Sequence, residues 1–316
     1  MGWKGAIRSI NASARRAERQ QRMAFAEQAR QNAYGTVVDF ENLLEGIVSI
    51  HHNVSPCVDW SKIRERKEPK KPGPIMVRQI KAQNVIDNYT PGSLIKFLKM
   101  ENWRRESLKK RLVKAIKNDA KETDKCVKEY EQDKDEWTQE RAIIKRIDKK
   151  EVQVFGELFE KYFKPSSYFE VEGVKIFDDN GKIGFECSIC SIDDVVPNQI
   201  YSLTKTGKLS VKDFPKTKRM QLYQDYACSV VLRIAREAFA ILPIKEVYVN
   251  AVVNGVNVRT GYLEEQNIIS TFIPQETISK LNLRNVDPSE CLKNFKNEMK
   301  FSKTNGFEPV KSLVNS

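Results

Sequence analysis

The sequence predicts an α+β protein: an elongated helical or coiled-coil N-terminal half, followed by an antiparallel-sheet domain packed on one long helix. Positive charge is concentrated in residues 1–117, which carry a net +13 against +12 for the whole chain. Residues 93–163 contain no proline and a single glycine, which favours a long helix. Past residue 165, short β-branched runs alternate with turn sequences, as in a sheet.

Residues 1–52 are expected to form basic helices. From Ile10 to Gln31 the sequence has no Gly or Pro and is rich in Ala, Arg, Gln and Glu, which favours a helix with little apolar surface. From Val37 to Ile50 apolar residues recur every three or four positions, as in a short amphipathic helix. We expect His51 and His52 to end this helix at a solvent-exposed corner.

Residues 53–92 are predicted to be a Pro/Lys-rich linker, because prolines at 56, 69, 72 and 74 stand among Lys and Arg. Ser93 is a suitable N-cap for a helix that continues with few breakers toward Phe163. Its apolar spacing is thin, so the coiled coil it could form is weak. Residues 93–164 are therefore predicted to be a long charged helix, a rod of about 75 Å for fifty residues, or a helical hairpin folded near residues 118–125.

Residues 165–316 are predicted to form the α+β domain. Its long helix, residues 217–242, has a wide apolar face and ends at Pro243. On it Arg233 and Glu237 stand four residues apart, as in an ion pair. A last helix is expected to begin at Asp287-Pro288 and to run through Lys300. The predicted strands are residues 168–171, 182–189, 200–203, 208–211, 247–253 and 268–273.

The chain has no run of about 18 apolar residues, and its N-terminus lacks the apolar core of a signal peptide. We therefore expect a cytoplasmic protein with no integral membrane association. Gly2 invites myristoylation, but that motif requires Ser or Thr where Ala6 stands. The six cysteines are widely spaced, which fits free thiols in a reducing compartment.

Several short segments resemble a family of uncharacterised bacterial proteins. The segments are Met1-Gly2-Trp3-Lys4-Gly5, Tyr223-Gln224-Asp225-Tyr226-Ala227-Cys228, Ala235-Arg236-Glu237, Met299-Lys300-Phe301 and Gly306-Phe307. The resemblance covers nearly the whole chain and implies a bacterial cytosolic protein with the same architecture, a basic coil-forming N-terminus before a C-terminal α+β domain. It implies no activity, cofactor or active site.

Two constellations have the residue types of metal or redox sites. Cys187 and Cys190 form a CxxC, but zinc needs a second pair, and residues three apart on a strand point to opposite faces. We interpret them as core or edge residues of a strand. The only histidines, His51 and His52, are adjacent, with Cys57 and Asp59 nearby, and we interpret them as a solvent-exposed helix end in preference to a metal or acid-base site. We predict no cofactor and no metal site.

A nucleic-acid-directed, metal-dependent hydrolase is the enzyme hypothesis that the basic charge suggests. Such enzymes commonly use a strand-borne Asp/Glu-x-Lys to hold Mg²⁺ and activate water. Tripeptides of this form, such as Glu68-Pro69-Lys70, Asp119-Ala120-Lys121 and Glu298-Met299-Lys300, lie in the predicted linker or on predicted helices. A GxxxxGK[ST] phosphate loop is absent. No catalytic residue is predicted.

The functional prediction depends on the basic residues of the N-terminal half. Its Lys and Arg residues are interleaved with Trp3, Trp60 and Trp103, so they could neutralise phosphates and place aromatic rings beside bases. An anionic membrane surface and merely solvated charge are the alternatives. The predicted nucleic-acid-binding residues are Arg8, Arg15, Arg16, Arg19, Arg22, Lys70, Lys71, Arg104, Arg105, Lys109 and Lys110.

We therefore expect a non-catalytic binding or assembly protein whose basic helical half recruits nucleic acid or a partner protein, or forms a homo-oligomer through its helices. The reason is that this half has helix propensity but too little apolar surface to be stable alone, and such segments gain order from partners. The metal-dependent hydrolase is one alternative. A subunit of a bacterial defence or mobile-element complex is another, suggested only by the character of the family.

Overall fold

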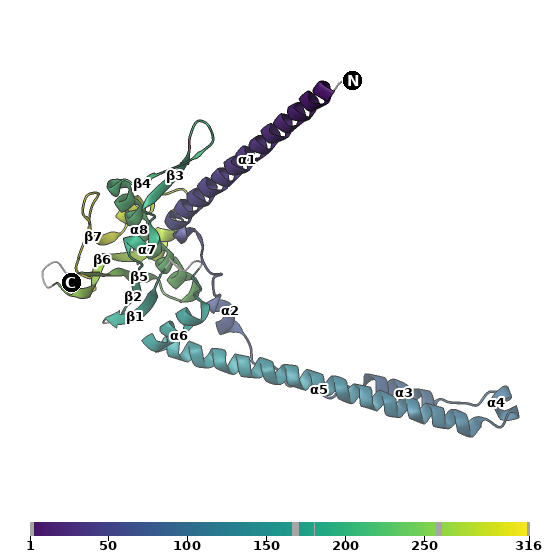
Figure 1. The fold of residues 1–316 in the computed structure, drawn as a ribbon. Coiled ribbons are helices and arrows are strands. Elements are labelled where there is room, and N and C mark those ends of the chain that lie inside the picture. Colours follow the sequence, from purple (N-terminus) through teal and green to yellow (C-terminus); the bar gives the residue numbers. More distant parts are fainter. Residues whose placement is uncertain (1–2, 166–170, 180, 257–260, 315–316) are drawn as a thin grey trace. The chain divides into compact units, whose positions relative to one another are not determined.

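The computed structural model describes residues 3–165, 171–179, 181–256 and 261–314, without the side chains of residues 3–22, Leu94, Lys96 and Val256. Contacts divide the chain into two compact units (Figure 1). Residues 1–58 and 150–316 form the first, which we call the sheet unit. Residues 59–149 form the second, the helical unit. This division differs from the expected one, because residues 1–58 group with the C-terminal domain.

The sheet unit contains a six-stranded sheet of order β1-β2-β5-β6-β7-β8. The α+β class is confirmed, but the sheet is mixed, since β2 and β5 are parallel and the other neighbours are antiparallel. A parallel pair needs a crossover connection, and α8 (Lys216–Ile241) lies in it. The strands are β1 (Gly173–Asp179), β2 (Lys182–Ser188), β5 (Glu246–Val256), β6 (Leu263–Pro274), β7 (Lys296–Ser302) and β8 (Gly306–Glu308).

Helix α8 forms the core of the sheet unit. Its apolar side chains are buried almost without interruption from Tyr226 to Ile241, opposite buried residues of β5 and β6 such as Val249 and Ile269. The crossover also contains the short helix α7 (Ile192–Val195). A separate two-stranded sheet in it pairs β3 (Gln199–Leu203) with β4 (Leu209–Asp213).

The N-terminal helices predicted separately are one helix, α1 (Trp3–Val48). Gly35 is accommodated inside it, since the helix runs without interruption through this residue. The C-terminal part of α1 packs on the β3–β4 sheet, where the Phe40 ring lies 5.4 Å from the Tyr201 ring. This burial explains why residues 1–58 belong to the sheet unit.

At the end of α1 the chain crosses α8 as a strap, which we define as residues 48–58, from the last residue of α1 and including the 3₁₀ helix η1 (Ile50–His52). The predicted exposure of His51 is wrong, since only 1% of it is accessible. Its Nε2 lies 2.8 Å from the Leu283 carbonyl, and its Nδ1 lies 2.7 Å from Ser229 Oγ. A carbonyl only accepts, so the neutral ring carries its hydrogen on Nε2, and Nδ1 faces the Ser229 hydroxyl, whose Oγ also lies 3.0 Å from the Val48 carbonyl oxygen.

Three further contacts hold the strap to α8. The Arg236 guanidinium donates to the carbonyls of His51 and His52. The Ser55 amide donates to Glu237 Oε1 at 2.8 Å, and the predicted ion pair of Glu237 with Arg233 is present at 2.7 Å, with both side chains buried. The Val58 amide donates to the carbonyl of Ala240 at 2.8 Å. The strap therefore follows one face of the core helix.

The helical unit consists of α2 (Trp60–Glu65), α3 (Val77–Asp87), α4 (Ser93–Phe97) and α5 (Glu101–Asp148). Helix α5 is continuous, so a hairpin folded near residues 118–125 is wrong. Its partner is instead the segment predicted to be a linker. Lys99, with a φ of 51°, separates α4 from α5, and Lys150, with a φ of 55°, precedes α6 (Val152–Tyr162), so the predicted single helix is three.

Side chains of α5 supply the N-terminal cap of α3. The cap residue of α3, Met76, makes no side-chain cap, and the Gln79 amide donates to Asp119 Oδ2 at 2.8 Å instead. The Ile75 amide likewise donates to Thr123 Oγ1 at 3.0 Å. Asp119 is 1% exposed, so a buried carboxylate of α5 binds the first turn of α3.

The C-terminal helix predicted over residues 287–300 is wrong. Asp287 does cap a helix, but α10 (Pro288–Cys291) and the 3₁₀ helix η2 (Leu292–Asn294) end after two short turns. The Asn297 amide group donates to the carbonyls of Leu292 and Phe295, and the following residues pair with β6 as β7. Another short helix, α9 (Gln275–Ser279), follows β6. Of the predicted strand 168–171, residues 168–170 lie outside the described residues.

Burial of the His51 ring makes stability depend on pH. Desolvation, and then the charges of His52 and Arg236, lower its pKa from 6.5 to about 4. The unfolded chain therefore binds more protons between pH 6.5 and 4, so this contribution to the unfolding free energy is complete above pH 6.5 and is lost as the pH falls, by about 3 kcal/mol at pH 4. Urea unfolding followed by circular dichroism should show that His51→Gln removes this part of the pH dependence. His52→Gln, which keeps His51, serves as the control, and equal slopes for both variants would contradict the prediction.

Removing the cap that α5 provides should loosen α3. We expect Asp119→Ala to weaken the pairing of α3 with α5 by about 1–2 kcal/mol, because the Gln79 amide loses its acceptor. Hydrogen exchange of the α3 amides, residues 80–87, measures the effect in the whole protein. Asp124→Ala, an exposed carboxylate on the same helix, is the matched control and should leave these rates unchanged.

Candidate nucleic-acid interface

One face of α5 combines lysines with a tryptophan. Trp103, Lys110, Lys114 and Lys117 are separated by seven, four and three residues, the spacing that places side chains on one helix face. All four are exposed, and Trp103 is 62% accessible. The opposite face holds buried Leu108 and Asp119, which lies against α3. We call these four residues the basic face.

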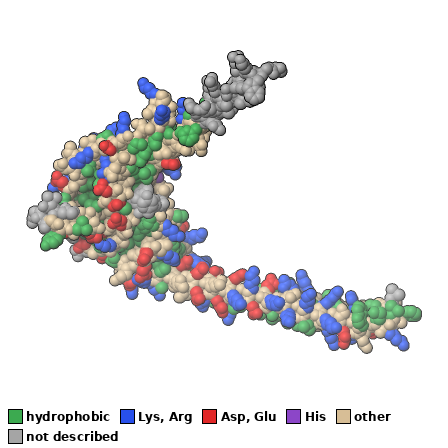
Figure 2. All heavy atoms as spheres, viewed as in Figure 1, with side chains coloured by type: hydrophobic (Ala, Val, Ile, Leu, Met, Phe, Trp, Pro, Cys, Tyr) green, Lys and Arg blue, Asp and Glu red, His purple; other side chains and the backbone are tan. Residues whose placement is uncertain are grey.

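The basic face lies in a part of α5 where cations have no carboxylate partner. Between residues 101 and 117 the helix carries seven Lys and Arg but only Glu101 and Glu106 as acidic residues. Among the side chains described in this stretch, none forms an ion pair within 4 Å. Figure 2 shows blue side chains along this part of the helical unit and green ones around α4. The local potential is therefore strongly positive.

The rest of α5 is neutralised by the segment that precedes α3. Arg66 Nη1 donates to both carboxylate oxygens of Glu140 at 3.0 Å, and Arg64 Nη2 lies 2.7 Å from Asp148 Oδ1. The Trp137 indole donates to the Arg66 carbonyl at 3.0 Å, and Arg141 Nη2 donates to the Ile63 carbonyl at 2.7 Å. The acidic half of α5 is thus occupied by a docked basic segment, while the basic half remains free.

The structure brings together some of the predicted nucleic-acid-binding residues and separates others. Arg104, Arg105, Lys109 and Lys110 follow one another on the first turns of α5. Lys70 and Lys71 are exposed but lie between the contacts of Glu68 with Lys134 and of Ile75 with Thr123, at least about 20 Å along α5 from Lys110 at 1.5 Å per residue. Arg8, Arg15, Arg16, Arg19 and Arg22 belong to α1, and their side chains lie outside those described.

Three cations of α5 were not singled out from the sequence, namely Arg111, Lys114 and Lys117. The local net charge contained them, but only a helix whose buried face is known shows which cations point outward with Trp103. A shallow cavity of about 380 Å³ lies on this side of the helix. It is lined by Trp103, Glu106, Ser107, Lys110, Arg111 and Lys114. Indole and ammonium groups therefore border one surface depression.

The CxxC does not have the environment of a reactive site. Cys187 lies inside β2 and its thiol donates to the Asn250 carbonyl at 3.1 Å, while burial raises its pKa to about 12. Burial also raises the pKa of Cys190, whose backbone bonds to the Tyr223 and Tyr226 hydroxyls. All six cysteines are free thiols, and the interpretation of the CxxC as core residues agrees with these contacts.

The hydrolase alternative gains one feature from the fold. Glu298 and Lys300 stand on β7, not on a helix, and both are exposed, so this Glu-x-Lys is strand-borne after all. Across the strand Lys300 is paired in register with Glu308. Within the described residues, however, no three His, Cys, Asp or Glu side chains are grouped so that they could hold a metal ion.

No protein-family model, curated protein or solved structure matches this chain. The resemblance to a bacterial family therefore stays a prediction. Among the described helices, none combines the length and the apolar composition that crossing a membrane requires.

Proposed function

We propose that the protein is a non-catalytic binding protein that holds single-stranded nucleic acid on the basic face of α5. The single observation that carries the proposal is the set of cations beside Trp103 that have no carboxylate partner among the described residues. Cations of this kind can replace the counterions of a phosphate backbone, and their release drives binding.

Trp103 directs the proposal toward single strands. An indole that is 62% accessible offers its face to a base, and only an unpaired base can stack on it. From Trp103 to Lys117 the helix rises about 21 Å at 1.5 Å per residue, enough to follow several nucleotides. Binding of this kind is tolerant of sequence, because every base has an aromatic face.

Removing the lysines of the basic face should weaken binding and its dependence on salt. We expect Lys110→Gln/Lys114→Gln/Lys117→Gln to lower the slope of log affinity against log salt by about 2, at about 0.7 for each single-strand phosphate contact. Fluorescence anisotropy of a labelled oligonucleotide at several salt concentrations measures both quantities. The matched control, Lys121→Gln/Lys125→Gln/Lys128→Gln, changes the same charge in the acidic half of α5 and should keep most of the slope.

Three results would contradict the proposal: no binding by the wild-type protein, equal losses in both triple variants, or a slope that does not change. Degradation of the oligonucleotide in Mg²⁺ or Mn²⁺ that a chelator prevents would instead favour the hydrolase alternative.

Removing the indole should affect single strands without changing the electrostatic contribution. Trp103→Ala is expected to weaken single-strand binding by about 1–3 kcal/mol, because one stacked base is lost, while the salt slope stays that of the wild type. Trp103→Phe keeps an aromatic face and should recover part of the affinity. If Trp103→Ala binds single strands as tightly as the wild type, the indole does not stack on a base.

Self-association through the helical unit is a second candidate function. Several large apolar side chains of this unit are exposed, among them Ile80, Val113 and Ile116, and a cavity of about 330 Å³ lies between α3 and α5. A partner helix would cover these side chains. Sedimentation of the wild-type protein without nucleic acid distinguishes this function, since a dimer held by apolar contacts persists at high salt.

A further inference from the structure

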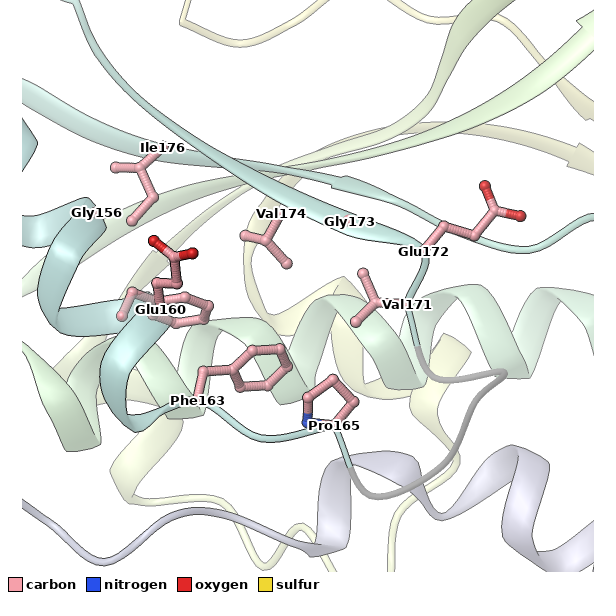
Figure 3. A pocket seen from close by; sticks show the side chains of 10 residues that line it. Gly156, Glu160, Phe163, Pro165, Val171, Glu172, Gly173, Val174 and Ile176 are labelled. Carbon is pink, nitrogen blue, oxygen red and sulfur yellow. The ribbon is translucent and has the colours of Figure 1, made fainter.

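A cavity of about 430 Å³ lies in the sheet unit between α6 and the edge strand β1. Figure 3 shows Val174 and Val171 pointing from the strand side toward Phe163 and Pro165. On the helix side the cavity is lined by Gly156, Phe159 and Glu160, whose spacing places them on one face of α6, and by Phe163, which directly follows the helix. Most of its lining side chains are apolar, polar groups form nearly half of its surface, and it belongs to no site described above.

The strand beside the cavity has a free edge. Among the described strands, β1 is hydrogen-bonded to β2 only, over the register from Gly173 opposite Ser188 to Asp179 opposite Lys182. Alternate amides and carbonyls of an edge strand point away from its neighbour and can pair with another extended chain. An added strand would place every second side chain on the face of β1 that carries Val174 and Ile176.

The charges around the cavity specify what such a strand would carry. Two carboxylates, Glu160 and Glu172, line it, and no Lys or Arg is among its lining residues. In Figure 3 the Glu160 carboxylate lies at the cavity wall near Ile176, whereas Glu172 points outward at the rim. A ligand that fits has an aliphatic or aromatic side chain for the apolar walls and a cationic one for the carboxylates.

We propose that this edge binds an extended basic peptide of a partner protein by strand addition to β1. Main-chain hydrogen bonds to the free edge provide the affinity, and the cavity selects an apolar side chain. Glu160 and Glu172 select Lys or Arg near it. The proposal does not depend on nucleic-acid binding by α5.

Gly156 offers a way to close the cavity without disturbing the fold. A Cβ at this position would meet no atom within 4 Å, and glycine is a poor helix former, so Gly156→Phe fills space while improving helix propensity. Gly46 in α1 also has open space around its Cβ position, so Gly46→Phe is the matched control.

The probe is an array of decapeptides that alternate leucine or valine with lysine or arginine. Matching arrays carry glutamate in place of the basic residues, or proline at alternate positions. We expect the full-length protein to bind basic peptides, at least tenfold weaker binding by Gly156→Phe, and unchanged binding by Gly46→Phe. Glu160→Lys should shift the preference from basic toward acidic peptides. Saturating basic peptide should slow hydrogen exchange of the β1 amides, as strand addition requires.

The proposal is overturned if no basic peptide binds, or if glutamate peptides bind the wild-type protein equally well. It is also overturned if proline peptides bind as tightly as basic ones, because proline cannot donate to the strand edge. Equal binding by Gly156→Phe and Gly46→Phe would place the peptide elsewhere.

Discussion

The arrangement of the sheet unit depends on the buried polar face of α8. Ser229, Arg236 and Glu237 lie on the core helix and bond to the backbone of the strap, so the segment after α1 cannot leave without exposing or orphaning these groups. A buried polar group that loses its partner costs its full desolvation free energy, whereas the net gain from making the bond is modest. The polar face therefore fixes where residues 48–58 lie, while its net contribution to the free energy of folding is modest. Through this constraint α1 joins the C-terminal domain, and its Phe40 reaches the β3–β4 sheet.

In the helical unit, polar contacts to α5 likewise decide where the other segments lie. Arg64 and Arg66 occupy carboxylates in the C-terminal half of α5, and Asp119 caps α3. The excess of positive over negative charge on α5 itself then lies between residues 101 and 117. Partially exposed ion pairs contribute little free energy individually, but their distribution decides which cations stay free. The proposed function depends on this distribution, because phosphate binding needs cations that are not already paired.

The strand order of the mixed sheet explains why β1 has a free edge beside the cavity. Since β2 pairs with β1 on one side and with the crossover partner β5 on the other, β1 is left at the edge. Helix α6 covers the adjoining face with Phe159, whose ring lies 4.8 Å from that of Phe185, but Gly156 leaves space beside it. Exposed edges are usually protected by charged residues, and β1 carries Lys175, Asp178 and Asp179. The apolar cavity beside this charged edge favours a selective partner over indiscriminate pairing.

The α+β class, the core helix over residues 217–242 and most strands followed from the sequence, because periodicity and turn chemistry are local properties. The Arg233–Glu237 pair was predictable for the same reason. Local pattern failed where a distant partner decided the conformation: residues 296–302 pair with β6 instead of continuing a helix, and the linker docks on α5 through Arg66 and Trp137. The sequence by itself determined that positive charge gathers before residue 118. Only the tertiary structure decided which cations are free and that His51 is buried, because both depend on contacts between residues far apart in the chain.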